Sequence, residues 1–131
     1  MRRVWVGVSR TLGVEALITR YIDPWFSEVG DDENPVAELV RSFGAGPFDP
    51  GDYEVYSREY AREHLPNERF DYALFKRLAP FAQSAPGLQR IRHDELTCMF
   101  WVIGGKQPAI RSDANVEITD VLDVTFDWEQ P

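Results

Sequence analysis

Hydrophobic and polar residues alternate at both ends of the chain. Val4, Val6 and Val8 share one parity near the start. Because successive side chains of a β-strand point to opposite faces, these patterns predict strands over residues 3–8 and 121–129. The buried face of the last strand would be Leu122, Val124, Phe126 and Trp128. Its exposed face would hold Asp123, Thr125, Asp127 and Glu129.

Apolar residues recur at helical spacing in three other segments, which predicts helices over residues 12–22, 35–43 and 70–82. Ser9 or Thr11 would cap the first helix, which would end before Pro24. Asn34 would cap the second helix and Gly44 would end it. The inner face of the second helix would consist of Val36, Leu39, Val40 and Phe43.

Two further strands are predicted between these helices and the last strand. Residues 53–60 are predicted to form one, with a helix over residues 56–65 as the alternative interpretation. The apolar run 96–103 has the length of a central strand that is buried on both faces. Pro86 and Gly87 would start a connection, and Gly104 with Gly105 would form a hairpin turn. The predicted fold class is α+β, a single domain over residues 1–131. A central sheet of about four strands would carry three or so packed helices.

The charge balance argues against two classes of partner. The chain has 14 basic and 22 acidic residues and a net charge of −8. Direct binding to nucleic acid or to an anionic membrane is disfavoured at that balance. No apolar stretch approaches the roughly 20 residues that span a bilayer. The only cysteine, Cys98, lies in an apolar run. An internal disulfide is therefore impossible, and a cytoplasmic location is favoured.

Acidic residues without nearby bases form two blocks, at residues 21–40 and 113–131. Acids held on a rigid scaffold attract a basic partner, and neighbouring aromatic residues would anchor it. The alternative interpretation is an exposed face that keeps the protein soluble and protects a sheet edge. The candidate partner-binding residues are Trp25, Asp31, Asp32, Glu33, Asp49, Asp52, Tyr53, Glu54, Asp123, Asp127 and Glu129.

Motifs for chemistry are weak in this sequence. His64, His93 and Cys98 show no zinc spacing, so we expect neither a metal nor a cofactor. We also expect no catalytic residue. A small hydrolase that uses a carboxylate at residues 49–54, or His93, is the alternative function. A third possibility is an assembly module whose acidic strand pairs edge-to-edge with a second copy. A protein that binds a foreign partner would instead be a monomer or a weak homodimer when free.

Short motifs in the first half of the chain resemble the immunity protein 22 family. The segment Val-Trp-Val-Gly-Val at residues 4–8 precedes a helix that ends in Arg-Tyr-Ile at 20–22. Ser-Phe-Gly at 42–44 and Phe-Asp-Pro-Gly-Asp-Tyr-Glu at 48–54 follow. The resemblance implies a cytoplasmic, non-enzymatic immunity protein of a bacterial polymorphic-toxin or contact-dependent growth inhibition system. Such a protein binds the basic C-terminal domain of a cognate toxin, often a nuclease, and blocks its active site.

Overall fold

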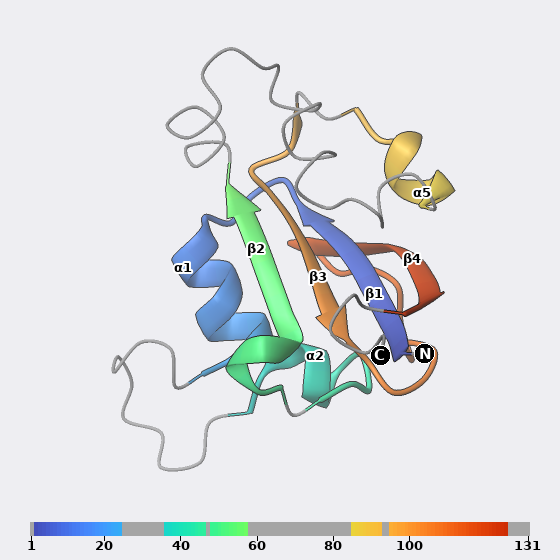
Figure 1. Ribbon diagram of the computed structural model, residues 1–131. Helices are drawn as coiled ribbons and strands as arrows, with labels where there is room; N and C mark the ends of the chain where they lie inside the picture. Colours follow the sequence, from blue (N-terminus) through green and yellow to red (C-terminus); the bar gives the residue numbers. More distant parts are fainter. Residues whose placement is uncertain (1, 25–35, 47, 58–84, 93–94, 126–131) are drawn as a thin grey trace.

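The computed structural model describes residues 2–24, 36–46, 48–57, 85–92 and 95–125 (Figure 1). These residues form a four-stranded antiparallel sheet with short helices packed on it, which confirms the predicted α+β class. The elements in chain order are β1 (Arg2–Ser9), α1 (Val14–Leu17), η1 (Ile18–Ile22), α2 (Glu38–Arg41), η2 (Pro50–Asp52), β2 (Tyr53–Ser57), α5 (Pro86–Gln89), β3 (Cys98–Ile103) and β4 (Val116–Val124).

The sheet has the order β2-β3-β1-β4, so β3 and β1 are its central strands. Val4 of β1 lies opposite Ile103 of β3 and Leu122 of β4. The strands predicted at residues 3–8 and 96–103 are therefore confirmed, and β3 is buried on both faces as expected. β2 begins at the predicted residue, Tyr53. Residues 58–60 and the helix predicted at 70–82 lie outside the described residues.

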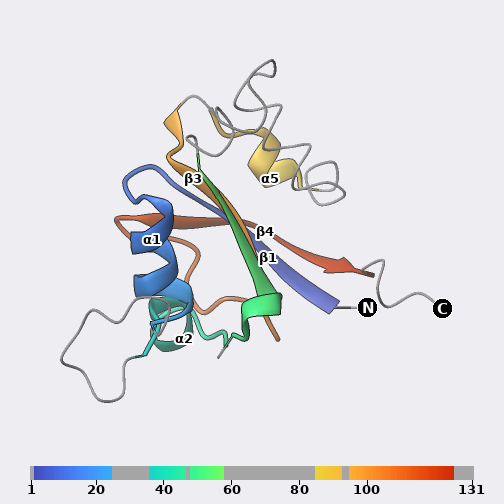
Figure 2. The ribbon, with the colours of Figure 1, turned by 60° about the vertical axis from the view of Figure 1, so that its left-hand side comes forward.

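Each face of the sheet carries its own hydrophobic core (Figure 2). On one face α1, η1 and α2 pack against Trp5 and Phe100 through Leu17, Tyr21 and Leu39. On the other face α5 packs through Leu88 against a core that comprises Val4, Val6, Val8, Tyr56, Met99 and Trp101. Both faces exclude water because the apolar residues of β1 and β3 occupy both parities.

The first predicted helix is present, but its start and its geometry differ from the prediction. It begins at Val14 after Gly13, which provides no side-chain cap. Ser9 instead accepts the backbone N–H groups of Thr11 and Leu12, at 3.3 and 3.0 Å, and so caps the turn before the helix. The last five residues, η1, form a π-helical turn that ends before Pro24. The N–H of Asp23 closes it by donating to the carbonyl of Ile18 at 2.7 Å.

The second predicted helix is shorter than expected. The described part, α2, starts after Ala37, which leaves Val36 outside the helical repeat and 53% exposed, so its predicted burial is wrong. Leu39 and Phe43 are buried as predicted. Gly44 ends the segment with φ 89°, a conformation that glycine adopts without steric strain. The proposed cap, Asn34, lies outside the described residues.

Two predictions about connections and one about the start of the last strand are wrong. Gly104 and Gly105 do not form a hairpin, because β1 lies between β3 and β4. Pro86 and Gly87 do not start a loop but form the first turn of α5. The last strand begins at Val116, five residues earlier than predicted, and a β-bulge interrupts its register with β1 between Val6 and Gly7.

Candidate functional site

Basic side chains hold the exposed acids of β4. Arg3 Nε lies 3.2 Å from Asp123 Oδ1, on the neighbouring strand. Arg10 Nη1 lies 3.4 Å from Glu117 Oε1. Surface pairs of this kind contribute about 0–1 kcal/mol each, but they neutralise the charge that a visiting cation would meet. This pairing argues against Asp123 as a contact for a basic partner.

Asp120 on the same strand is buried and serves the fold. It is 7% exposed and shares the face of Leu122 and Val124. Its carboxylate accepts the backbone N–H groups of Gly87 and Leu88 at 2.9 and 2.8 Å. These are N–H groups of the first turn of α5, which have no partner inside the helix. The sequence could have indicated this role, because a carboxylate at a strand position that faces the core needs hydrogen-bond donors around it.

A second acid of the C-terminal block, Asp113, joins the loop before β4 to the π-helical turn. Tyr21 donates its hydroxyl to Asp113 Oδ2 at 2.5 Å, and Asp113 Oδ1 accepts the N–H groups of Asn115 and Val116, both at 2.8 Å. Burial acts to raise the pKa of Asp113. The hydrogen bonds and the charge of Arg20 outweigh it and leave that pKa below its ordinary value. The pKa of Tyr21 is raised by burial and by the bond to Asp113.

The remaining described candidates lie at the start of β2. Asp49 and Asp52 cap η2 reciprocally, each side chain accepting the other's backbone N–H, with Asp49 N to Asp52 Oδ2 at 3.1 Å. Glu54 is exposed and accepts the hydroxyl of Tyr56. We call Asp49, Asp52 and Glu54 the acidic turn. No arginine or lysine among the described residues pairs with any of these three carboxylates.

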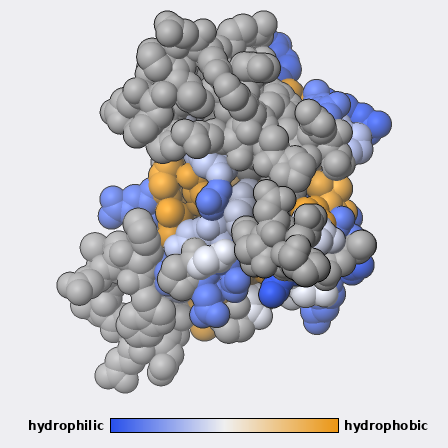
Figure 3. Space-filling view, viewed as in Figure 1, coloured by the Kyte–Doolittle hydropathy of each residue, from blue (hydrophilic) through white to orange (hydrophobic). Residues whose placement is uncertain are grey.

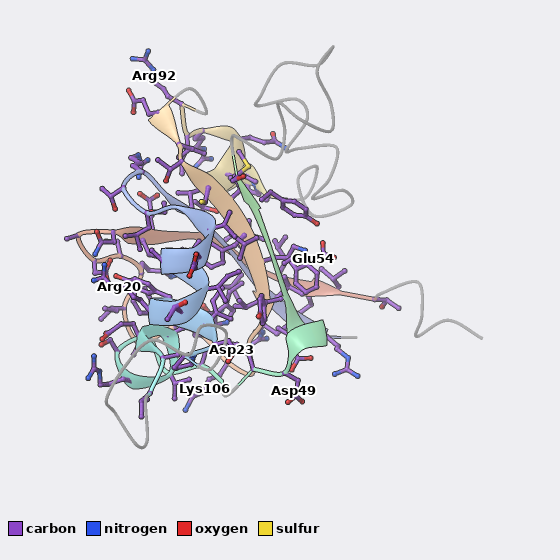
Figure 4. All side chains as sticks on the ribbon, turned by 90° about the vertical axis from the view of Figure 1, so that its left-hand side faces the viewer. Arg20, Asp23, Asp49, Glu54, Arg92 and Lys106 are labelled. Carbon is purple, nitrogen blue, oxygen red and sulfur yellow. The ribbon has the colours of Figure 1, made fainter. Side chains whose placement is uncertain are left out.

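Tyr53 and Glu54 point to opposite faces of the sheet. The candidate residues at the start of β2 therefore do not all lie on one surface. Tyr53 packs half-buried on the helix side and bonds to Asp23, whereas Glu54 lies on the side of Tyr56. Burial, and then the charge and hydrogen bond of Asp23, raise the pKa of Tyr53. Figure 4 shows Asp49 at the η2 end of β2, with Asp23 on one side of the strand and Glu54 on the other.

The hydrolase alternative finds little support in this geometry. A catalytic acid needs an apolar, enclosed environment. Asp49 and Glu54 are exposed on a turn and an edge strand, and Asp52 is committed to capping. Within the described ranges, no three His, Cys, Asp or Glu side chains are grouped so that they could hold a metal ion. Cys98 is buried, with its thiol directed at the carbonyl of Leu12.

The other predicted site residues lie outside the described residues. They are Trp25, Asp31, Asp32, Glu33, Asp127 and Glu129, together with His93 of the alternative function. The structure therefore neither joins them to the acidic turn nor separates them from it. Among the helices of the described part, none has the length and apolar character needed to cross a membrane.

Comparison with protein-family models, with curated proteins and with solved structures found no match for this chain. Membership of the immunity protein 22 family therefore stays a prediction from the motifs at residues 4–8, 20–22 and 42–54.

Proposed function

We propose that this protein is a cytoplasmic, non-enzymatic inhibitor of the immunity type, which binds a basic toxin domain and blocks its active site. One observation supports this proposal above the others. Arg3 and Arg10 hold acids of β4, whereas the acidic turn has no described basic partner. The acidic turn therefore keeps a charge that a basic partner would neutralise.

The acidic turn is also held in a fixed shape. The reciprocal bonds of Asp49 and Asp52 fix η2, and Tyr56 restrains Glu54. Side chains that are ordered before binding lose less conformational entropy when the complex forms. Nucleases hold the phosphate backbone with Lys and Arg, so carboxylates on a rigid turn would engage the same cationic groups.

A growth-protection assay tests the inhibitor proposal directly. The C-terminal toxin domain of a secreted protein encoded beside this chain is expressed in bacteria with and without it. We expect the toxin domain to stop growth alone and this chain to restore growth by forming a stable complex. Growth arrest that this chain does not relieve would refute the inhibitor proposal.

Neutral variants then test the surface. Asp49→Asn, Asp52→Asn and Glu54→Gln together keep hydrogen-bonding groups and remove the charge. We expect affinity for the toxin domain to fall by about tenfold or more at low salt, and the difference from the wild type to shrink as salt screens the charges. Asp123→Asn is the matched control, because Arg3 already neutralises that acid. An equal loss of affinity in the triple variant and in Asp123→Asn would exclude the acidic turn as the main contact.

A further inference from the structure

The outer side of β4 is covered over its first half. The loop before β4 bonds to the strand from outside, because the carbonyl of Arg111 accepts the N–H of Ile118 at 2.6 Å. α5 is fixed at the next positions through the two bonds that Asp120 accepts. Beyond Asp120 the strand continues to Val124 as an edge of the sheet. Figure 2 shows this last part of β4 extending away from α1 and α2.

The bonds of the neighbouring strands show which backbone groups of β4 face inwards. The N–H of Gly104, directly after β3, donates to the carbonyl of Arg3 at 3.0 Å, so the backbone groups of Arg3 point towards β3. Successive residues of an antiparallel strand point their backbone groups to opposite sides. Val4 therefore points towards β4, where Leu122 lies opposite. The N–H and C=O groups of Leu122 are thus used within the sheet.

The two residues that flank Leu122 face the open side. By the same alternation, Val121 and Asp123 direct their N–H and C=O groups away from β1. The register shift of β4 lies before this stretch, between Val6 and Gly7 of β1, and does not disturb it. No residue in the part of the chain that the structure describes hydrogen-bonds these outward groups. Unpaired backbone groups on an edge are a template for another strand.

The side chains of this edge are apolar on one face and compensated in charge on the other. Leu122 and Val124 are half-buried and pack against the core on the α5 side. Figure 3 shows hydrophobic beside hydrophilic surface on the right-hand side of the molecule, where β4 lies in Figure 1. On the opposite face Asp123 pairs with Arg3 at 3.2 Å. The acid of residues 121–124 therefore has its counter-charge within the same chain.

A second copy of this chain matches the edge. With a two-fold axis at Leu122, antiparallel pairing places Val121 of each copy opposite Asp123 of the other, so all the outward N–H and C=O groups find partners. The two Leu122 side chains then form a non-hydrogen-bonded pair, in which side chains approach closely. We propose that the protein forms a weak two-fold dimer through residues 121–124 of β4, which joins the two four-stranded sheets into one.

Charge is compatible with this dimer because of the pair between Arg3 and Asp123. The Asp123 carboxylates of the two copies lie on diagonal positions about 7–8 Å apart, and each has an arginine beside it. β2 is the opposite edge of the sheet, so the dimer leaves both acidic turns at its ends. The two-fold axis also closes the assembly at two copies. This dimer does not depend on the function proposed above.

Asp123→Pro tests the backbone pairing. The N–H of residue 123 faces away from β1, so proline removes an edge donor and leaves the bonds between β1 and β4 in place. Asp123→Ala is the matched control, because it also loses the pair with Arg3 but keeps the donor. Sedimentation equilibrium from about 10 μM to about 1 mM protein measures the dimer. We expect its dissociation constant to rise about tenfold or more in Asp123→Pro and by no more than about threefold in Asp123→Ala.

Oxidative cross-linking tests the register, and it stays informative if the proline variant does not fold. Leu122→Cys places two thiols at the axis, where Cβ atoms about 4.5–5.5 Å apart come close enough for a disulfide. Val124→Cys on the same face is the control, because pairing places it opposite Asp120 and far from its own counterpart. Cys98 is buried in both variants. We expect the disulfide dimer to form about tenfold faster in Leu122→Cys.

Three outcomes would overturn the dimer or its geometry. A wild-type protein that stays monomeric up to about 1 mM overturns the dimer. Equal weakening by proline and by alanine at residue 123 overturns pairing through the backbone of β4. Equal cross-linking at residues 122 and 124 overturns the axis at Leu122. None of these results affects the inhibitor proposal, which growth protection tests separately.

Discussion

Two aspartates on one strand have opposite roles, which the residue environment alone decides. Asp120 is buried and bonds two N–H groups of α5, whereas Asp123 is exposed and pairs with Arg3. A hydrogen bond to a charged group contributes about 1.5–3 kcal/mol, and a surface ion pair about 0–1 kcal/mol. The buried carboxylate therefore matters more for stability than the exposed one.

We predict that Asp120→Ala lowers the free energy of unfolding by about 2–4 kcal/mol, because two buried donors of α5 lose their acceptor. Asp123→Ala is the matched control and should lower it by less than about 1 kcal/mol. Urea unfolding followed by tryptophan fluorescence measures both. Equal effects would show that the contacts of Asp120 with α5 do not stabilise the fold.

The Tyr21–Asp113 bond predicts a pH dependence with a defined sign. The folded pKa of Asp113 is lowered, so its stabilisation is present above the ordinary value of 3.8 and is lost as pH falls through the folded pKa. The folded pKa of Tyr21 is raised, so its stabilisation is present below the ordinary value of 10.0 and is lost as pH rises through the folded pKa. Asp113→Asn should weaken the acid decline in the unfolding free energy. An unchanged acid decline in that variant would contradict the assignment.

At the scale of elements, the connection after β3 covers Trp5 in the core on the helix side of the sheet. Trp5 is fully buried, and its indole N–H donates to the carbonyl of Lys106 at 2.7 Å. Gly104 lies against this ring, where a Cβ would come within 2.4 Å of the indole nitrogen. A Cβ on Gly105 would meet no atom within 4 Å, so adjacent glycines differ in their tolerance of a side chain.

We predict that Gly104→Ala destabilises the protein by about 1–3 kcal/mol, because the buried indole ring has to move. Gly105→Ala should stay within about 0.5–1 kcal/mol of the wild type. Thermal unfolding of the two variants provides the comparison. A larger loss for Gly105→Ala would contradict the packing against Trp5.

Local patterns predicted β1 from the alternation of Val4, Val6 and Val8, and β3 from the continuous apolar run of a strand that is buried on both faces. They missed α5 because its stabilising acceptor, Asp120, is 33 residues from Gly87. They missed the start of β4 because the bulge switches its inward face. Ile118 packs on the helix side and Leu122 on the α5 side, although both positions are even-numbered.

At the scale of the whole molecule, charge pairing decides which acids remain available. The sequence predicted the acidic blocks, but Asp123 and Arg3 are 120 residues apart and Glu117 and Arg10 are 107 apart. No local window contains both members of either pair. The sheet order brings them together and leaves the acidic turn without a described basic partner.

We predict that Glu54→Val increases self-association, because it removes the charge that opposes pairing of two β2 edges. Light scattering should show dimers or larger species at concentrations where the wild type is a monomer. Glu15→Val on the exposed face of α1 makes the same chemical change away from the edge and should leave the protein monomeric. Equal association of both variants would point to general loss of solubility instead.

The position of β1 between β3 and β4 has a consequence for biosynthesis. β1 is translated first of the four strands, yet both of its neighbours lie beyond residue 97. At about 5–20 residues per second, the ribosome needs roughly 5–20 s to make those neighbours. During that interval the valine-rich segment at residues 4–8 has no native strand beside it, so the nascent chain is a natural client for chaperones that hold apolar segments.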